Sequence, residues 1–546
     1  MRTALKNFYN LLKLDRTEIY AIYILAILAG LVQLSLPLGI QTVISFVMAG
    51  SVSTSIVVLI ILVVLGTFVD GLLQVRQLQV LEKLKQGIFL RYAFEFAGRL
   101  PKLNVEKLDK YYLPEVVNRF FDTVSLQKGL EKLLLDLPAA VIQVFLGLIL
   151  LAFYHPVFIG FGVLLLTIVV LIMVFTMPRG FSLALQSSEY KYSIAAWLQE
   201  VARMVKSFKY IKSGSLHLSK TDELACGYVE SRTKYFKVLL VQFWSLTSFK
   251  IVITASMLIV GTILLVNQQI NIGQFIASDI IILAIINSVE KIVLSLDKVY
   301  DALVSIKKLD KIAEAEEEAS GEILLDAEEE GLDIQFNNVA FSYPGAGAVL
   351  SQLTLRILPG QMALIHGRSG AGKSTLLRLL TGAYSNYSGS IMVNSLAVNN
   401  YNLDSLRAAT GVMLSSQDIF YGSLLENITM GNANVTIKEV NHLAEKLNLL
   451  PFIQAQKEGL YSQLYPGGKK LPGNTRQKIL LIRALLGYHR LLLLEEPFAY
   501  LDGADRTALI ALLRQLKNTT IIITSEDSGL AGLFDISFHI TAVQNK

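Results

Sequence analysis

The sequence predicts an α-helical domain with six membrane spans, followed by an α/β domain. Three observations lead to this fold class. Long uncharged stretches fill the first half of the chain, an acidic segment follows them, and short apolar strands then alternate with helical patterns around a glycine-rich motif. Runs of about 20 apolar residues are long enough to span a bilayer, whereas alternating strands and helices are typical of α/β domains.

Composition supports a chain that lies partly in lipid. Hydrophobic residues make up 53% of the 546 residues, charged residues only 17%, and the mean hydropathy is +0.50, which is too apolar for a soluble protein of this length. The formal charge of +5 comes without a dense run of Lys and Arg, so a nucleic-acid partner is not indicated. The single cysteine, Cys226, excludes an internal disulfide.

The first four spans are expected as two hairpins. Residues 19–69 contain no charged side chain, which is enough for two crossings with a turn at about 49–54. Residues 137–178 lack Asp, Glu, Lys and Arg and are again long enough for two crossings. They are interrupted near Pro156, which has no N–H with which to continue a helix.

The last two spans carry charged residues. One lies near residues 238–266 and contains Lys250, and the other lies near 272–296 and contains Asp279 and Glu290. At about 1.5 Å per residue, Lys250 and Glu290 both lie roughly 25 Å below the turn that joins the two spans. We therefore expect that they can pair near the inner surface of the bilayer, and a functional role within the membrane is the alternative.

The positions of Lys and Arg predict the topology. None occurs in the three hairpin turns, whereas the N-terminus and the long segments 70–136 and 179–237 are rich in both. Cytoplasmic loops carry the excess of basic residues, so both termini are expected in the cytoplasm. The two long segments contain little Pro or Gly and are predicted to be helices that extend beyond the bilayer. A short amphipathic elbow is expected before the first span.

An acidic segment separates the two halves. Residues 1–312 form the predicted transmembrane domain, residues 313–331 contain many acidic and small residues, and residues 332–546 form the predicted α/β domain. A segment of such composition buries little apolar surface, so a solvated linker is expected.

The strongest motif is a glycine-rich loop of the form GxxxxGK[ST]. It follows the apolar strand 362–365 and leads into a helix. Glycines let backbone N–H groups curl around phosphates, the lysine reaches the terminal phosphates, and the hydroxyl of the following serine ligates Mg²⁺. The residues predicted to bind a nucleotide here are Gly367, Arg368, Ser369, Gly370, Ala371, Gly372, Lys373, Ser374 and Thr375.

The stretches around and after this loop resemble the nucleotide-binding domain of ABC transporters. Tyr343, in FSYPG, matches the family's adenine-stacking aromatic residue, and Gln417 matches the glutamine that touches both Mg²⁺ and the membrane domain. LPGNTRQKILLIRALL resembles the signature, LLLLEEPFAYLD the acidic strand, and TTIIITSEDS the strand that ends at the switch histidine. The whole chain resembles a half-transporter of the type I exporters, and YYLPEVVNRFFDTV resembles their docking loop. The resemblance implies ATP and Mg²⁺ as cofactors, with Ser374, Gln417 and Glu495 as metal ligands.

Three motifs depart from the family pattern. Glu495 stands where the family has Asp before the base that polarises water, and Glu496 stands in the position of that base. Residues 471–475 read LPGNT instead of LSGGQ, and Ser525 replaces the switch histidine. Positioning and acid-base groups typically contribute about 10² to 10⁴ in rate. The resemblance therefore predicts ATP binding with slow or absent hydrolysis.

The resemblance also implies partners. ATP is sandwiched between two such domains in this family, so a second half-transporter, either identical or different, is expected in the lipid bilayer. The membrane half resembles the exporters of type I secretion and bacteriocin systems, which implies a peptide, protein or lipid-like substrate and a periplasmic adaptor in a bacterial inner membrane. The alternative is a regulatory, nucleotide-gated membrane subunit that binds ATP without turnover.

Overall fold

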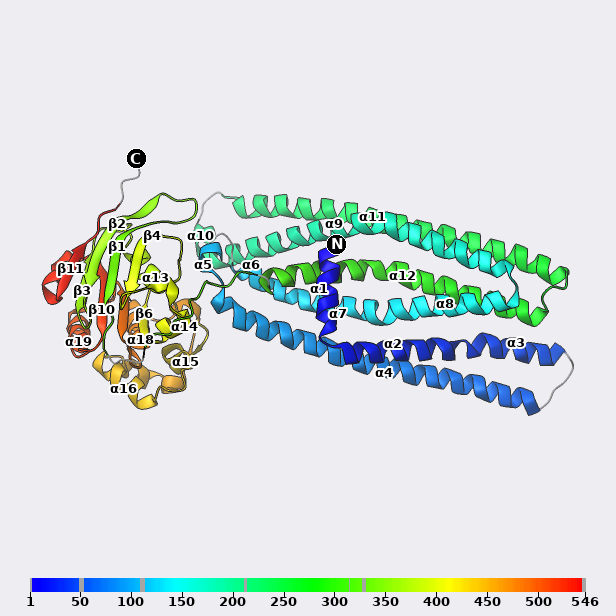
Figure 1. The fold of residues 1–546 in the computed structure, drawn as a ribbon, viewed down its shortest axis with the longest axis horizontal. Coiled ribbons are helices and arrows are strands. Elements are labelled where there is room, and N and C mark those ends of the chain that lie inside the picture. Colours follow the sequence, from blue (N-terminus) through cyan, green and yellow to red (C-terminus); the bar gives the residue numbers. More distant parts are fainter. Residues whose placement is uncertain are drawn as a thin grey trace. The chain divides into compact units, whose positions relative to one another are not determined.

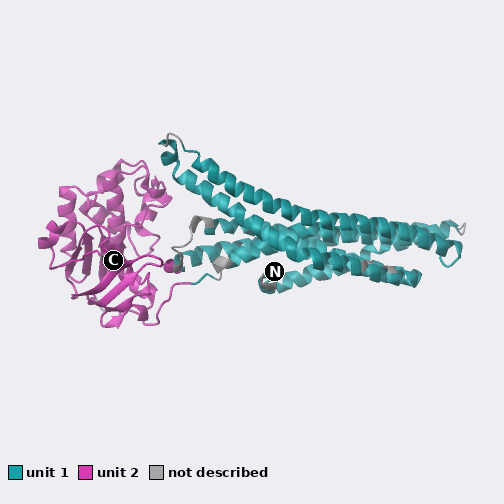
Figure 2. Ribbon diagram, turned by 90° about the horizontal axis from the view of Figure 1, so that it is seen from above, with its two compact units in different colours: residues 1–103, 110–316 teal, residues 104–109, 317–546 magenta. Residues whose placement is uncertain are grey.

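The computed structural model describes residues 2–48, 54–108, 113–210, 214–313, 315–326 and 330–542. The chain forms two compact units (Figure 2). The first comprises residues 1–103 with 110–316, and the second comprises residues 104–109 with 317–546. Each unit has its own buried core, as expected for a chain of this length.

The first unit is built from helices in its described residues, and short turns connect them (Figure 1). Short segments follow α4 and surround α7, namely η1 (Leu100–Lys102), η2 (Arg119–Phe121) and the π-helical η3 (Lys132–Asp136). The helices are α1 (Arg2–Lys13), α2 (Arg16–Gln33), α3 (Ser35–Met48), α4 (Thr54–Arg99), α6 (Leu113–Asn118), α7 (Asp122–Glu131), α8 (Leu137–Tyr154), α9 (Val157–Arg203), α10 (Val205–Tyr210), α11 (Leu216–Val266) and α12 (Ile272–Ala313).

The six predicted spans are confirmed. Among the described residues, six helical stretches are long and apolar enough to cross a membrane. Five of them continue for 39 to 51 residues without an intervening loop, which at 1.5 Å per residue exceeds the bilayer core. The chain also breaks at His155 and turns at 267–271 as expected, whereas most of the predicted turn at 49–54 lies outside the described residues.

The first span is not one continuous helix. It is divided at Leu34 into α2 and α3, and the Leu34 N–H bonds to the carbonyl of Leu31 in a tighter turn. Pro37 follows in the first turn of α3. Because proline has no N–H, it cannot bond to the carbonyl of Gln33, and this missing bond accounts for the division.

Packing in the first unit centres on long helix pairs. α9 packs along α11, α2 packs along α4, and α12 packs against α7, α8 and α3. Buried apolar side chains of α12, such as Ile285, Leu296 and Leu303, lie in these contacts. Lys250 on α11 donates to Glu290 on α12 across 2.5 Å, which confirms the predicted pair.

The second unit contains a five-stranded parallel sheet in the order β11-β3-β10-β9-β6. Its inner strands are continuous apolar runs because both faces are covered, as is typical of parallel sheets. A second, antiparallel sheet has the order β2-β1-β4-β5. The strands are β1 (Ile334–Ser342), β2 (Ala348–Ile357), β3 (Met362–His366), β4 (Ser388–Val393), β5 (Leu396–Ala397), β6 (Thr410–Met413), β7 (Gly422–Ser423), β8 (Gln463–Leu464), β9 (Leu491–Glu495), β10 (Thr520–Ser525) and β11 (Ile536–His539).

Helices surround these sheets (Figure 1). Short 3-10 segments lie in the connections between these elements, namely η4 (Val398–Asn400), η5 (Gly459–Tyr461), η6 (Pro466–Gly468) and η7 (Ser528–Leu533). The helices of the unit are α5 (Val105–Leu108), α13 (Lys373–Leu380), α14 (Leu403–Ala408), α15 (Leu424–Thr429), α16 (Ile437–Lys446), α17 (Leu450–Ala455), α18 (Gly473–Leu485) and α19 (Gly503–Leu513).

The described part of the acidic segment is held more closely than a free linker would be. Its residues 317–326, which we call the acidic strap, stay mostly exposed but bind along the second unit. Glu318 forms a two-pronged ion pair with Arg407, and Asp326 accepts from Arg490 at 2.7 Å. Ile323 forms a parallel bridge with Tyr401. Arginine partners far along the chain hold the strap, which the local composition does not indicate.

Candidate functional site

The predicted site residues lie at one edge of the parallel sheet. β3 leads into the glycine-rich loop, β6 into residues 414–417, β9 ends at Glu495, and β10 ends at Ser525. These four strands are parallel neighbours, so their carboxyl ends meet at the same edge. Ligands of open α/β sheets bind at this edge.

The glycine-rich loop is shaped by backbone geometry that requires glycine. Gly370 and Gly372 have φ angles of +81° and +91°, in the region that L-residues with side chains rarely adopt. A Cβ at Gly372 would also come within 2.6 Å of the Leu350 side chain. The tip residues, Arg368 to Gly370, are exposed, and α13 begins immediately after the loop. The loop thus presents open backbone and a helix N-terminus, which fits an anionic phosphate group.

Lys373 is buried at the start of α13. Its ammonium donates to the carbonyl of Gly367 at 2.7 Å and of Arg368 at 3.3 Å. It also lies 3.9 Å from a carboxylate oxygen of Glu496 and 3.9 Å from one of Glu526. The lysine is therefore surrounded by two backbone carbonyls of the loop and by two carboxylates that follow β9 and β10.

Ser374 and Glu495 are in direct contact. The Ser374 hydroxyl donates to Glu495 at 2.5 Å. Ser415 donates to the same carboxylate twice, from its hydroxyl and from its backbone N–H, each at 2.8 Å. Ser415 is not among the residues predicted from the sequence, although its position two residues before Gln417, just after β6, is a signal that could have found it. Serine hydroxyls and a carboxylate in one cluster are oxygen ligands of the kind that Mg²⁺ prefers.

Glu496 adopts a strained backbone conformation. Its φ is 45°, and its N–H bonds to the carbonyl of Thr524 at 2.9 Å. The Ser525 hydroxyl donates to the Glu496 carboxylate at 3.2 Å. Burial raises the pKa of Glu496 above its ordinary value, while the charge of Lys373 and the bond from Ser525 act in the opposite direction. Residues held in sparsely populated backbone conformations, as Glu496 is, cluster at functional sites.

Tyr343 and Gln417 differ in how closely they approach the loop. The Tyr343 hydroxyl lies 3.0 Å from the Thr375 hydroxyl, so the structure brings this ring to the loop helix. Gln417 instead hydrogen-bonds within its own turn, where its side chain accepts from the Leu414 N–H at 3.4 Å. Among the described residues it makes no hydrogen bond to Ser374 or Glu495. It does share a cavity of about 410 Å³ with Glu495 and Glu496.

Residues 471–475 are tied to a neighbouring helix. Asn474, in the first turn of α18, donates to Asp505 on α19 at 3.0 Å. Lys478 pairs with the same carboxylate at 2.7 Å, and Asn448 donates to it at 3.0 Å. Burial alone would raise the pKa of Asp505, but these hydrogen bonds and the charge of Lys478 hold it below its ordinary value. Asn474 thus has a structural partner within the chain.

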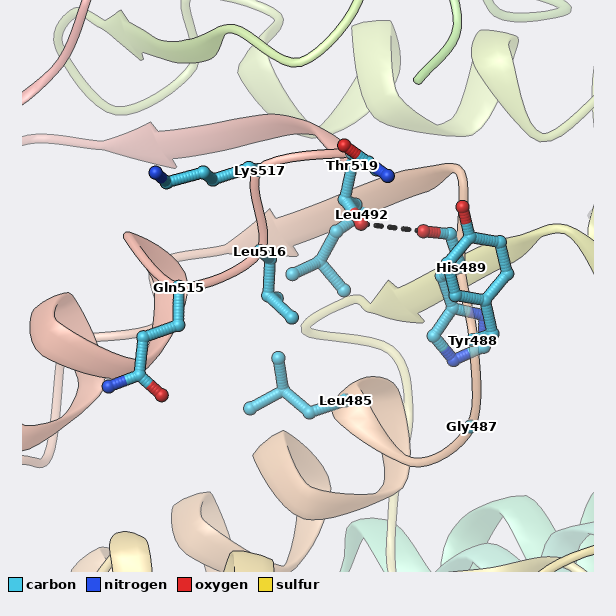
Figure 3. A pocket seen from close by; sticks show the side chains of 10 residues that line it. Leu485, Gly487, Tyr488, His489, Leu492, Gln515, Leu516, Lys517 and Thr519 are labelled. Carbon is cyan, nitrogen blue, oxygen red and sulfur yellow. Dashed lines mark hydrogen bonds between the residues drawn. The ribbon is translucent and has the colours of Figure 1, made fainter. Parts of the chain in front are cut away.

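A second cavity, of about 300 Å³, lies at the opposite ends of the strands (Figure 3). Leu485, Leu492 and Leu516 contribute its apolar part, and the Thr519 hydroxyl donates to the carbonyl of His489 at 2.7 Å beside it. None of the predicted site residues lines this cavity. The candidate site is therefore the edge formed by the carboxyl ends of the strands.

Comparisons with known proteins agree with this assignment. Residues 350–499 match the family described as ABC transporter. The matched region includes the glycine-rich loop, Gln417 and Glu496, whereas Tyr343 and Ser525 lie outside it.

Curated relatives and a solved structure extend the similarity. The chain is 29% identical over 334 residues to the alpha-hemolysin translocation ATP-binding protein HlyB of Escherichia coli O157:H7, which covers 60% of this chain and 47% of that protein. It is 36% identical over 196 residues to the ATP-dependent lipid A-core flippase 2 of Colwellia psychrerythraea, covering 35% of this chain and 33% of that protein. This chain thus covers less than half of each relative. The structure of a bacterial Atm1-family ABC exporter with ATP bound matches with a TM-score of 0.87 and 19% identity, covering 97% of this chain and 94% of the other, which shows a shared fold.

Proposed function

We propose that this chain, which carries an ABC transporter domain and has the fold of an ABC exporter, is a half-transporter that binds MgATP and moves a peptide, protein or lipid-like substrate across a membrane. The multi-pass character follows from its six apolar helical stretches. A bacterial inner membrane with both termini in the cytoplasm is the proposed location, because the basic residues avoid the three hairpin turns.

The contact between Ser374 and Glu495 carries the proposal. It joins the residue that follows the phosphate-binding lysine to the end of β9, next to the exposed tip of the glycine-rich loop. Bound Mg²⁺ would neutralise phosphate charge there. Ser374, Glu495 and Gln417 would hold the ion, residues 367–375 would hold the phosphates, and Tyr343 would stack on the adenine.

The motifs that would promote ATP hydrolysis depart from the family pattern, whereas the glycine-rich loop that would bind the nucleotide matches it. Glu496 would polarise water, but Ser525 is too short to reach beyond the Glu496 carboxylate to which it donates. Asn474, in the segment that would face the ATP of a second subunit, is tied to Asp505. We therefore propose binding with slow turnover.

The proposed assembly is a dimer of half-transporters in the bilayer. A second copy or a different half-transporter would supply the other half of each nucleotide site. The relatives include a translocation protein and a lipid flippase, which supports a large or amphipathic substrate. A periplasmic adaptor is a further proposed partner.

Nucleotide binding by the purified, reconstituted full-length protein tests the proposal. Lys373→Ala removes the ammonium and is expected to weaken MgATP binding by about 10- to 100-fold, the range for a charged hydrogen-bonding group. Lys517→Ala removes an exposed lysine of the same unit and is the matched control. Equal binding by the wild type and Lys373→Ala would contradict the proposed site.

The second candidate function is a nucleotide-gated or regulatory membrane subunit. The replaced switch position at Ser525 and the tie between Asn474 and Asp505 favour it. Vanadate trapping separates the two candidates, because only a hydrolysing protein traps ADP. Trapped ADP supports the transporter, whereas saturable ATP binding without trapping supports the regulatory subunit.

A further inference from the structure

A second carboxylate lies beside the lysine of the glycine-rich loop. Glu526 directly follows the end of β10 at Ser525. One of its carboxylate oxygens lies 3.9 Å from the Lys373 ammonium, the same distance as that of Glu496. The Glu526 side chain is 59% exposed, whereas Lys373 is 8% exposed. A largely buried cation therefore faces one half-buried and one exposed carboxylate.

The two carboxylates differ in how they are held. Glu496 accepts a hydrogen bond from Ser525, and its backbone is tied to Thr524. Glu526 approaches Lys373 from the exposed side. It lies just after β10, which pairs with β3, the strand that leads into the glycine-rich loop. Because a phosphate-loop lysine pairs with the terminal phosphates of a nucleotide, phosphate oxygens and Glu526 need the same ammonium.

We propose that Glu526 is a specificity-determining residue of this site, which competes with the γ-phosphate for Lys373 and so disfavours a nucleoside triphosphate relative to a diphosphate. The inference rests on the proposed nucleotide site. Its physical basis is twofold: the triphosphate must replace the carboxylate at Lys373, and its additional negative charge is repelled by that carboxylate. A diphosphate has no γ-phosphate to compete with Glu526 for the Lys373 ammonium, and its smaller negative charge is repelled less by the Glu526 carboxylate.

The neighbouring acidic residue provides a matched control. Asp527 carries the same charge one residue later, but its carboxylate accepts from the Gly529 N–H at 2.9 Å and begins η7. Asparagine retains this capping role. Asp527→Asn therefore removes one negative charge close to the site without removing a neighbour of Lys373.

The test compares triphosphate and diphosphate binding to the full-length protein in nanodiscs with Mg²⁺ present. The probes are a non-hydrolysable ATP analogue and ADP. Glu526→Gln is expected to tighten triphosphate binding by about 1.5- to fivefold, the range for an exposed ion pair, while ADP binding changes by less. The gain is expected to shrink at high salt, because exposed charges are screened. Glu526→Asp, which keeps the charge, is expected to retain more of the wild-type preference.

Three results would overturn the inference. These are an equal change in triphosphate and diphosphate affinity in Glu526→Gln, the same change in the ratio in Asp527→Asn, and no change in either. Loss of the proposed function gives a different pattern, because wild type, Lys373→Ala and Glu526→Gln would then all lack saturable nucleotide binding.

Discussion

Ser374 at the start of α13 donates a hydrogen bond to Glu495 at the end of β9 across 2.5 Å. The family that this chain resembles has an aspartate at the position of Glu495, and the aspartate side chain is shorter by one methylene. The longer side chain lets the carboxylate reach the hydroxyl directly, while Ser415 holds it from the other side. The proposed Mg²⁺ would share these same oxygen atoms.

Glu495→Asp is expected to raise the rate of phosphate release and the apparent affinity for Mg²⁺. The shorter side chain withdraws from Ser374 and leaves room for a hydrated ion, and a misplacement of about 1 Å near a reacting centre costs on the order of 10²-fold. Phosphate release measured against Mg²⁺ concentration checks this. Glu495→Gln, which keeps the length and loses the charge, is the control. A rate in Glu495→Asp at or below that of Glu495→Gln would contradict the interpretation.

Asp505→Asn is expected to destabilise the second unit by about 3 kcal/mol, because it leaves buried Lys478 without its charged partner. The folded pKa of Asp505 lies below its ordinary value of about 3.9, so its contribution is present above that pH and is lost as pH falls through the folded pKa. The loss in melting temperature by calorimetry should therefore be the same at pH 7 and pH 5. Glu445→Gln, at an exposed position on α16, is the control. A loss that disappears at pH 5 would contradict this sign.

The pair Lys250 and Glu290 is expected to stabilise the helical unit. Exchanging the two charges in one double variant should restore most of the melting temperature that Lys250→Glu or Glu290→Lys loses alone. The expected coupling is about 1–3 kcal/mol, as for residues in direct contact. Thermal melting in detergent measures it, and Lys291→Glu, at the exposed neighbouring position, is the control. Additive losses would indicate that the pair contributes nothing.

Gly321→Ala is expected to release the acidic strap from the second unit. An added Cβ would come within 2.2 Å of the Asn400 backbone, and backbone cannot move aside as a flexible side chain can. Limited proteolysis within residues 317–326 should become faster, because the clash costs about 1–3 kcal/mol in local stability. Gly503→Ala, where an added Cβ meets nothing within 4 Å, is the control. Unchanged proteolysis in Gly321→Ala would show that the strap is not held there.

The parts that were predictable from the sequence depend on local patterns. Uncharged runs define spans, and the glycine-rich loop is contiguous, so both follow from residues that are close in the chain. The contacts of Ser415 with Glu495 and of Glu526 with Lys373 do not follow from local patterns, because they form only when the parallel strands align their ends. The order of the strap likewise depends on Arg407 and Arg490, which lie far along the chain. The division at Leu34 was not predicted, because Pro37, which accounts for it, lies within a long uncharged run.

Phosphate release at saturating MgATP by the reconstituted full-length protein tests the central claim, which separates nucleotide binding from rapid hydrolysis. Ordinary enzymes turn over at about 10 per second. We expect saturable, Lys373-dependent binding with a release rate at least about 10²-fold lower, because Ser525 and Asn474 replace groups that promote hydrolysis. Release at tens per second that disappears in Glu496→Gln would contradict the account.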